Sequence, residues 1–338
     1  MIIDCHAHLS PPPELNAYRK WLLETDGSEG IGDPKISDDA IRAALNNVDN
    51  DKNSGPFSHL DGMLEGNIDV QLLSPRPNQM MHSHKIDKVV QYFAKSCNDI
   101  IYRTTQLWQD KFIGIAGLPQ TAGKPVDAAV QELERCVTEL GFKGCMLNPD
   151  PFENSGPKSP PLWDPYWHPL YEKLVELDVP CHIHGMGQKT DREAYNHYYI
   201  DEVSTAILGF VGSNILDDFP ELKILASHGG GSIPYQMGRY IAGARKHKQQ
   251  ELGSKFRKIY YDTVLHDSNS TEFLIKVMGV DNVLFGTEWP GLGSVIDPDT
   301  GRTMDNLAPA INDINWLSQE DKDRILCRNA ENIFNLHT

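Results

Sequence analysis

The chain of 338 residues has an ordinary globular composition, with 40% hydrophobic and 23% charged residues. Its formal net charge of −16 at pH 7 argues against binding to the phosphate backbone of nucleic acids, and no apolar run approaches the roughly 20 residues of a membrane-spanning helix. The six cysteines show no regular spacing, and the N-terminus lacks the basic and long apolar segments of a signal peptide. We therefore expect a cytoplasmic protein with free thiols, and no nucleic-acid or membrane partner.

Short apolar runs alternate with longer amphipathic segments along the chain. The eight runs span residues 2–8, 70–74, 112–118, 142–147, 180–184, 222–227, 259–264 and 283–286. The helix-like segments span residues 87–107, 125–140, 165–177, 232–248 and 271–278. This alternation predicts a parallel α/β sheet, and eight strands in a chain of this length predict a distorted (β/α)8 TIM barrel, a single domain over residues 1–338. An open doubly wound sheet is the alternative, but no GxGxxG motif follows a strand here.

The gap between the first and second runs is too long for one crossover helix. It contains several helix-like pieces and the sequence "PPPELNAYRKWLLETDGSEGIGDPKISDD". It follows the C-terminal end of a strand, which is the end where barrel active sites are built. We therefore predict that residues 11–66 form an insertion on the catalytic face that acts as a lid.

Polar side chains stand at the C-terminal ends of most predicted strands. The first strand carries His6 and His8, which share one face because residues i and i+2 of a strand point the same way. The other strand ends carry Arg76, Asn148, Asp150, His182, His184, His228, Asp262 and Glu288. Because the C-terminal ends of barrel strands converge, we expect these side chains to meet in one pocket.

Two HxH pairs and a carboxylate are a suitable set of metal ligands. Imidazole nitrogens and carboxylate oxygens bind Zn²⁺ well, and we expect one ion per chain. A lone HxH pair is more often a pair of satisfied core or surface histidines, so the prediction rests on the convergence of the strand ends. The candidate ligands are His6, His8, His182, His184 and Glu288, and the spacing does not decide between His182 and His184.

Four longer strings resemble the amidohydrolase superfamily, in the branch typified by aminocarboxymuconate-semialdehyde decarboxylase. They are "DCHAH", "HIHG", "SHGGG" and "LFGTEWP", and they span nearly the whole chain. Within that branch, "LLSPRPNQMM", "LNPDPFENS" and "PGLGSVIDPDTG" are most similar to the 4-oxalomesaconate (4-carboxy-2-hydroxymuconate) hydratases. The resemblance implies a metal-dependent hydratase that adds water to a C=C bond of an unsaturated polycarboxylic keto or enol acid in the breakdown of aromatic compounds.

The resemblance also implies roles for individual residues. Most members of the branch carry Asp at the end of the eighth strand, where this chain has Glu288. The hydratase resemblance implies that Glu288 moves a proton, and His228 is the second candidate because both titratable groups would face the ion. It favours His184 over His182 as the metal ligand.

The expected substrate is a small polycarboxylate anion, and its carboxylates need cations. Arg76 is the first candidate, because its planar fork binds a carboxylate through two hydrogen bonds and two prolines flank it; the alternative is an ion pair with a loop acid. Further candidates for substrate binding are Asn148, Tyr195, His197, Arg239 and Ser294. The three glycines at 229–231 could bind a carboxylate through their N–H groups or form a tight turn.

Other functions remain open at this point. A nonoxidative decarboxylase of an aromatic or muconate acid would use much the same residues. An amide or lactone hydrolase is a further alternative, and a non-catalytic metal-binding protein is another. We also expect a homo-oligomer, and we expect His82 and His84 to be exposed or to cap a helix.

Overall fold

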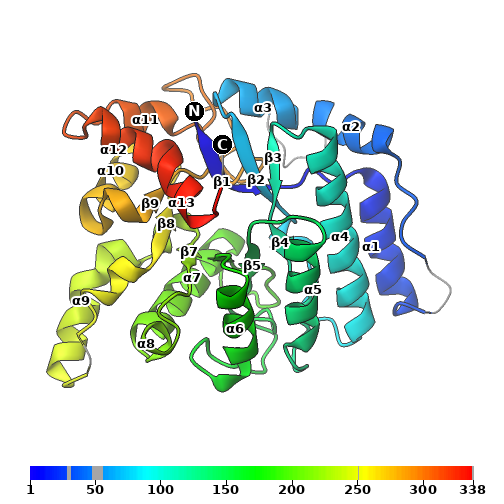
Figure 1. The fold of residues 1–338 in the computed structure, drawn as a ribbon, viewed down its shortest axis with the longest axis horizontal. Helices are drawn as coiled ribbons and strands as arrows, with labels where there is room; N and C mark the ends of the chain where they lie inside the picture. Colours follow the sequence, from blue (N-terminus) through cyan, green and yellow to red (C-terminus); the bar gives the residue numbers. More distant parts are fainter. Residues whose placement is uncertain (29–31, 48–55, 250, 337–338) are drawn as a thin grey trace.

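The computed structural model describes residues 1–28, 32–47, 56–249 and 251–336. Within these residues the parallel strands form two sheets, one of order β1-β2-β3 and one of order β4-β5-β6-β7-β8-β9. Their bounds are β1 (Ile3–His8), β2 (Val70–Ser74), β3 (Phe112–Gly114), β4 (Ala116–Gly117), β5 (Cys145–Leu147), β6 (Cys181–Ile183), β7 (Ile224–Ala226), β8 (Tyr260–Asp262) and β9 (Val283–Leu284). These strands surround the centre of the molecule in Figure 1.

Backbone hydrogen bonds close the two sheets into one barrel. β3 and β4 are the two halves of the third predicted strand, and Ile115 between them donates its N–H to the carbonyl of Leu73 at 2.9 Å. At the other junction, Cys5 donates to the carbonyl of Phe285 and His8 to that of Trp289, both at 2.9 Å. The eight expected strands therefore form a closed, distorted (β/α)8 barrel, which confirms the predicted fold.

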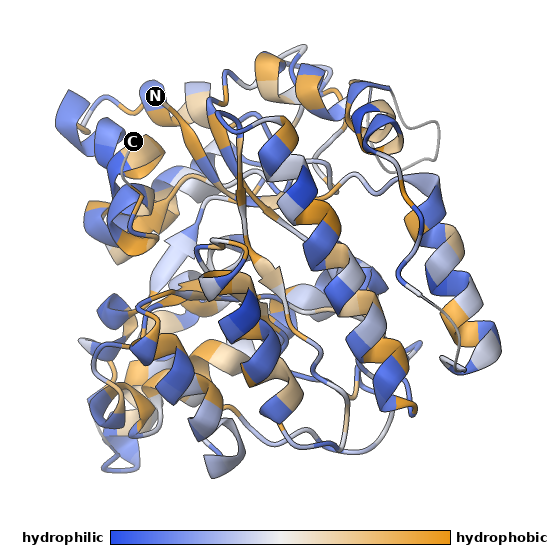
Figure 2. Ribbon diagram, turned by 45° about the vertical axis from the view of Figure 1, so that its right-hand side comes forward, coloured by the Kyte–Doolittle hydropathy of each residue, from blue (hydrophilic) through white to orange (hydrophobic). Residues whose placement is uncertain are grey.

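Helices pack around the strands (Figure 1). Their bounds are α1 (Pro13–Thr25), α2 (Asp38–Asn46), α3 (His59–Glu65), α4 (Asp87–Leu107), α5 (Asp127–Thr138), α6 (His168–Glu176), α7 (Tyr195–Val211), α8 (Ile215–Asp218), α9 (Ile233–Lys246), α10 (Ser268–Met278), α11 (Ala308–Asn312), α12 (Gln319–Asp323) and α13 (Asn329–Ile333). Figure 2 shows that most strands are hydrophobic along their length, whereas the helices alternate hydrophobic and hydrophilic residues. This is the pattern of helices that bury one face against a sheet. None of the described helices is long and apolar enough to span a membrane.

The barrel interior is filled from several strands. Ile3, Leu72, Met146, Leu225 and Leu284 belong to one buried cluster, which α13 completes with Ile333 and Phe334. This packed interior leaves the C-terminal ends of the strands as the place for a site.

The segment between β1 and β2 forms α1, α2 and α3, and Figure 1 shows α1 and α2 outside α4. Its helix α3 packs closely on the segment after β9, since a Cβ atom on Gly62 would lie 1.9 Å from the Trp289 ring. Residues 29–31 and 48–55 of the predicted insertion lie outside the described part of the chain. The lid role therefore stays a prediction.

Candidate active site

Four side chains that could hold a metal ion, the candidate metal-ligand group, meet at the C-terminal ends of the strands. His6 and His8 end β1, His184 follows β6, and Glu288 lies four residues after β9. One ligand atom from each of these residues lies within 4.8 Å of the others, and all four side chains are buried. His182 belongs instead to a second group, with His6 and Asp262.

The hydrogen bonds of His6 and His8 direct two nitrogen lone pairs at each other. His6 Nδ1 lies 2.7 Å from Asp262 Oδ2, so this nitrogen carries the proton. His8 Nδ1 lies 3.0 Å from Ser74 Oγ, and that hydroxyl donates to the carbonyl of Ala7, so His8 Nδ1 is also the donor. The two Nε2 atoms, 3.3 Å apart, therefore both present lone pairs. A cation between them would turn this repulsion into attraction.

Other buried imidazole nitrogens lack hydrogen-bond partners. His184 Nδ1 donates to the carbonyl of Gly185 at 2.5 Å, which leaves the lone pair on its Nε2. Within the described residues, the Nε2 atoms of His182, His184 and His228 are buried without a hydrogen bond. A buried polar group without a partner costs roughly 1–3 kcal/mol. This donor set therefore fits a divalent first-row metal ion.

Burial and neighbouring charges set the protonation states. Burial lowers the pKa of His6 to about 4 and that of His228 to about 3, so both imidazoles are neutral at pH 7. Burial alone would raise the pKa of Glu288, but the imidazoles of His228, His184 and His266 around its carboxylate hold that pKa well below its usual range. Neutral imidazoles and an ionised carboxylate are the forms that bind a metal or accept a proton.

Several residues at the site adopt a left-handed backbone conformation that non-glycine residues rarely adopt. The φ angles are 65° at Glu288, 52° at His228 and 55° at His266. Such conformations cost of order 1–3 kcal/mol each and cluster at functional sites. The conformation at Glu288 is held by its N–H, which donates to the carbonyl of His6 at 2.6 Å.

The glycines at 229–231 serve the turn rather than a ligand. All three have positive φ, and a Cβ atom on Gly230 would lie 2.6 Å from the Tyr261 ring. Their N–H groups donate to Asp262 Oδ1 and to the carbonyls of Ser227 and His228. Of the two alternatives, the structure favours the tight turn over carboxylate binding, because these donors are already used within the protein.

A cavity of about 600 Å³ lies beside the metal-ligand group. It is lined by His8, His184, His228 and Glu288, and by three of the expected substrate-binding residues, Arg76, Tyr195 and Ser294. Arg76 Nε donates to the carbonyl of Leu9 at 3.1 Å, which fixes the guanidinium at the cavity wall. The cavity is large enough for a small polycarboxylate.

The other expected substrate-binding residues do not line this cavity. Asn148 is fully buried, with its amide beside His82 Nδ1 at 2.9 Å. His197 is exposed on α7 and pairs with Asp201 at 3.4 Å, and Arg239 is exposed on α9. The structure does not bring these three residues to the metal-ligand group. His82 is also buried, contrary to expectation, because its ring bonds Asn148 and the carbonyl of Leu118.

Sequence reasoning missed two residues at the cavity and left one unassigned. His266 Nε2 lies 3.8 Å from Glu288 Oε2, but His266 is four residues beyond β8 and therefore past the predicted strand end. Tyr199 lies one helical turn after Tyr195 on α7, a helix that the sequence reading did not include. The sequence identifies Asp262 as an acid at a strand end but assigns it no function. In the structure its carboxylate accepts a hydrogen bond from His6 and so orients that ring.

The sequence pattern of the amidohydrolase family matches residues 3–336. The chain belongs to the amidohydrolase family. This amidohydrolase is 34% identical to a 2-keto-4-carboxy-3-hexenedioate hydratase from Sphingobium sp., over 99% of this chain and 96% of that protein. The crystal structure of 4-oxalomesaconate hydratase from Rhodopseudomonas palustris superposes with a TM-score of 0.85 at 34% identity, over 99% of this chain and 96% of that one. A 2-amino-3-carboxymuconate-6-semialdehyde decarboxylase from Dictyostelium discoideum is 26% identical, over 97% and 90%.

Proposed function

We propose that this amidohydrolase is a metal-dependent hydratase that adds water across a C=C bond of 4-oxalomesaconate or a closely related unsaturated polycarboxylic acid. The full-length likeness to two hydratases carries the proposal, since both are 34% identical whereas the decarboxylase is 26% identical. The reaction belongs to the breakdown of aromatic compounds. We further propose that the protein is a cytoplasmic homo-oligomer.

In this proposal His6, His8, His184 and Glu288 hold one Zn²⁺ ion per chain. These four side chains form the larger candidate ligand group, and three imidazoles with a carboxylate suit zinc. When bound, the ion lowers the pKa of a water molecule and polarises a substrate oxygen. His182 remains outside the ligand set, beside Asp262 at 3.4 Å.

Glu288 is the proposed base. Its carboxylate is ionised and faces the cavity, so it can take a proton from the attacking water as the water oxygen bonds to one carbon of the double bond. The electron pair of the double bond moves into the conjugated carbonyl, and a proton delivered to the neighbouring carbon completes the hydration. His228, whose Nε2 lies 3.9 Å from Glu288 Oε1, is placed to carry this proton.

Arg76, Tyr195 and Ser294 are the proposed substrate-binding residues of the cavity. Arg76 is the proposed carboxylate-binding residue, because it lines the cavity, its Nε bond to the carbonyl of Leu9 holds the guanidinium in place, and a guanidinium suits a carboxylate. Tyr195 and Ser294 supply hydroxyl groups at other points of the wall. Asn148, His197 and Arg239 are left out of the proposal, since they lie away from this cavity.

The test is to incubate the metal-loaded protein with 4-oxalomesaconate and to follow its ultraviolet absorbance together with the mass of the product. Hydration removes the conjugated absorbance and adds one water, whose oxygen comes from isotopically labelled solvent. Decarboxylation releases CO₂ and incorporates no oxygen label. A product that has lost CO₂ without gaining water would replace the hydratase by the decarboxylase alternative, and an aromatic carboxylic acid provides the substrate control for that activity.

A further inference from the structure

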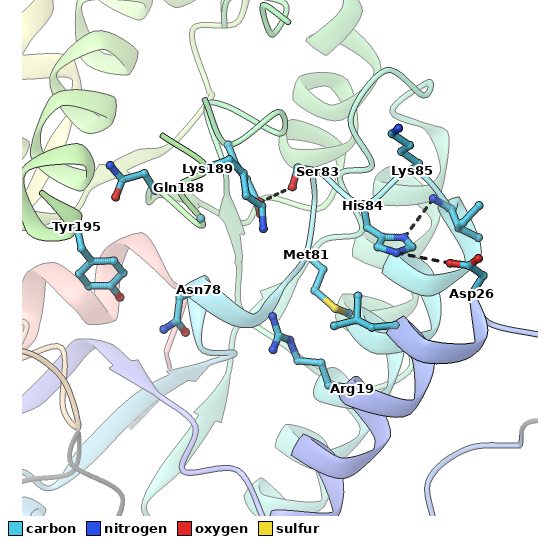
Figure 3. A pocket seen from close by; sticks show the side chains of 14 residues that line it. Arg19, Asp26, Asn78, Met81, Ser83, His84, Lys85, Gln188, Lys189 and Tyr195 are labelled. Carbon is cyan, nitrogen blue, oxygen red and sulfur yellow. Dashed lines mark hydrogen bonds and ion pairs between the residues drawn. The ribbon is translucent and has the colours of Figure 1, made fainter. Parts of the chain in front are cut away.

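A second cavity, of about 630 Å³, adjoins the catalytic one. The two cavities share Asn78 and Tyr195 in their walls, so they are neighbours. Figure 3 shows the second cavity between α1, the segment after β2 and the segment after β6, which contribute Arg19, Met81 and Lys189 respectively. The metal-ligand residues do not line it.

Arg19 projects from α1 toward the space between Asn78 and Met81 (Figure 3). Its Nε donates to the carbonyl of Gln79 at 3.0 Å, and among the described residues it forms no ion pair and no other hydrogen bond. Burial lowers the pKa of the Arg19 guanidinium, although the group stays charged at neutral pH. A partly buried guanidinium without a carboxylate at its terminal nitrogens is costly, and an anionic ligand would offset that cost.

The carboxylates at this cavity already have partners. Glu153 is buried, accepts a hydrogen bond from Ser83, and lies 3.6 Å from Lys189 Nζ. Asp26 is mostly exposed and lies 3.9 Å from His84 Nε2. Lys85 adds a further exposed cation, so the walls carry three permanent cations against two carboxylates. In a chain of net charge −16, such a local excess of positive charge is where an anion would concentrate.

Arg19 and Arg76 are arranged alike on the two sides of one short segment. Each donates its Nε to a backbone carbonyl, at 3.0 and 3.1 Å, which anchors the guanidinium, and each residue lines one of the two cavities. Between them, the 3₁₀ turn Pro77–Gln79 carries Asn78 into both cavities. Because Arg76 is the proposed carboxylate fork of the catalytic cavity, the same geometry gives Arg19 the same chemistry.

We propose that the second cavity binds a di- or tricarboxylate, with Arg19 as the fork that holds a carboxylate and with Lys85 and Lys189 at the rim. The choice of a polycarboxylate rests on the proposed function, because substrate and product of that reaction share this chemistry. The ligand is either the substrate on its way to the catalytic cavity or a separate anion that acts as an effector.

The test uses tricarballylate, a saturated tricarboxylate that cannot be hydrated, and the full-length metal-loaded protein labelled with ¹³C at its methionine methyl groups. Met81 lines the second cavity, and no methionine lines the catalytic one within the described residues. Its signal is assigned by its loss in Met81→Leu. We expect the Met81 signal to shift saturably with tricarballylate in the wild type, and Arg19→Gln to weaken this binding at least tenfold.

Lys20→Gln is the matched control, since it removes the same charge from an exposed neighbour on α1 that does not line the cavity. It should bind tricarballylate within twofold of the wild type, and Arg19→Lys, which keeps the charge but loses the fork, should be intermediate. Melting temperature and metal content check that each variant is folded. The proposal is overturned if the Met81 signal does not shift with tricarballylate, or if Arg19→Gln binds tricarballylate as tightly as the wild type. It is also overturned if Lys20→Gln weakens the binding as much as Arg19→Gln does.

Steady-state kinetics then identify the occupant. A raised KM for the unsaturated acid in Arg19→Gln means that the site holds substrate in transit, whereas an unchanged KM with lost tricarballylate binding means a separate effector anion. The Met81 titration needs no turnover, so it still tests the second cavity if the hydratase assay fails. The hydratase assay likewise still tests the proposed function if the Met81 titration fails.

Discussion

Glu288→Gln tests the role of the proposed base most directly. The substitution keeps the size of the side chain and removes its charge, and it leaves the backbone atoms that bond His6 unchanged. The carboxylate oxygens lie 3.8 Å from His184 Nε2 and 3.9 Å from His228 Nε2. The variant therefore loses a proton acceptor at the centre of the site while the three proposed imidazole ligands His6, His8 and His184 remain.

The expected loss follows from the chemistry of proton transfer. A positioned general base contributes roughly 10²–10⁴ in rate, so kcat should fall by about that factor. At about 1.4 kcal/mol per factor of ten, this corresponds to roughly 3–5 kcal/mol of activation free energy. Catalytic zinc sites commonly keep three protein ligands, so the ion should remain bound. Substrate binding through Arg76 should persist as well.

The assay combines single-turnover and steady-state absorbance measurements with metal analysis of the same preparation. Glu288→Asp shortens the side chain by one methylene and should also be slow, through misplacement of an intact base. Glu202→Gln is the control for loss of an acid outside the cavity, on α7. Near-normal turnover of Glu288→Gln with full metal content would refute the assignment, and the proton would then travel through His228.

Three further outcomes are expected. Arg76→Lys should raise KM more than it lowers kcat, because the charge stays and the fork is lost, and an unchanged KM would leave Arg76 a structural role. His6→Ala, or chelation of the wild type, should remove the ion and the activity while circular dichroism shows an intact barrel; full activity without metal would refute the metal site. Burial, and secondly repulsion from Asp150, raises the pKa of Glu202 to about 8. The folded protein therefore loses stability as the pH rises from the pKa of Glu202 in the unfolded chain to about 8, because the carboxyl ionises less readily in the folded protein. Glu202→Gln should therefore raise the free energy of unfolding at pH 9 by on the order of 1–2 kcal/mol after solvent screening, seen as a higher melting temperature, and should have no effect at pH 4; an equal gain at both pH values would contradict this.

The strand ends were predictable because the residues that end barrel strands are close in sequence to the apolar runs that define the strands. His6, His8, His184 and Glu288 each lie within such a run or at most two residues after it, and the barrel brings them together. The strand pattern alone did not separate His182 from His184, since residues two apart on a strand point the same way. In the structure His184 follows β6 and groups with His6, His8 and Glu288, whereas His182 lies within β6 beside Asp262.

The remaining errors have physical causes. Helix α7 was missed because it is buried on several sides, with Tyr198, Val203 and Phe210 all covered, so its apolar residues give no simple amphipathic period. His82 was expected at the surface, but long-range hydrogen bonds to Asn148 and Leu118 bury it. Partners that lie 36 and 66 residues away in the chain leave no local signal.

The strained backbone at Glu288 is supported by the contacts that close the barrel. Its N–H bonds the carbonyl of His6, and His8 in turn donates to the carbonyl of Trp289, so Glu288 is held between two bonds that join β1 to the last strand. Trp289 is itself fixed by α3, since its indole N–H donates to the carbonyl of His59 and its ring covers Gly62. The hydrogen bonds that close the barrel therefore also set the distance between the carboxylate and the β1 histidines. Helix α3, one of the helices inserted after β1, therefore braces the segment that carries Glu288.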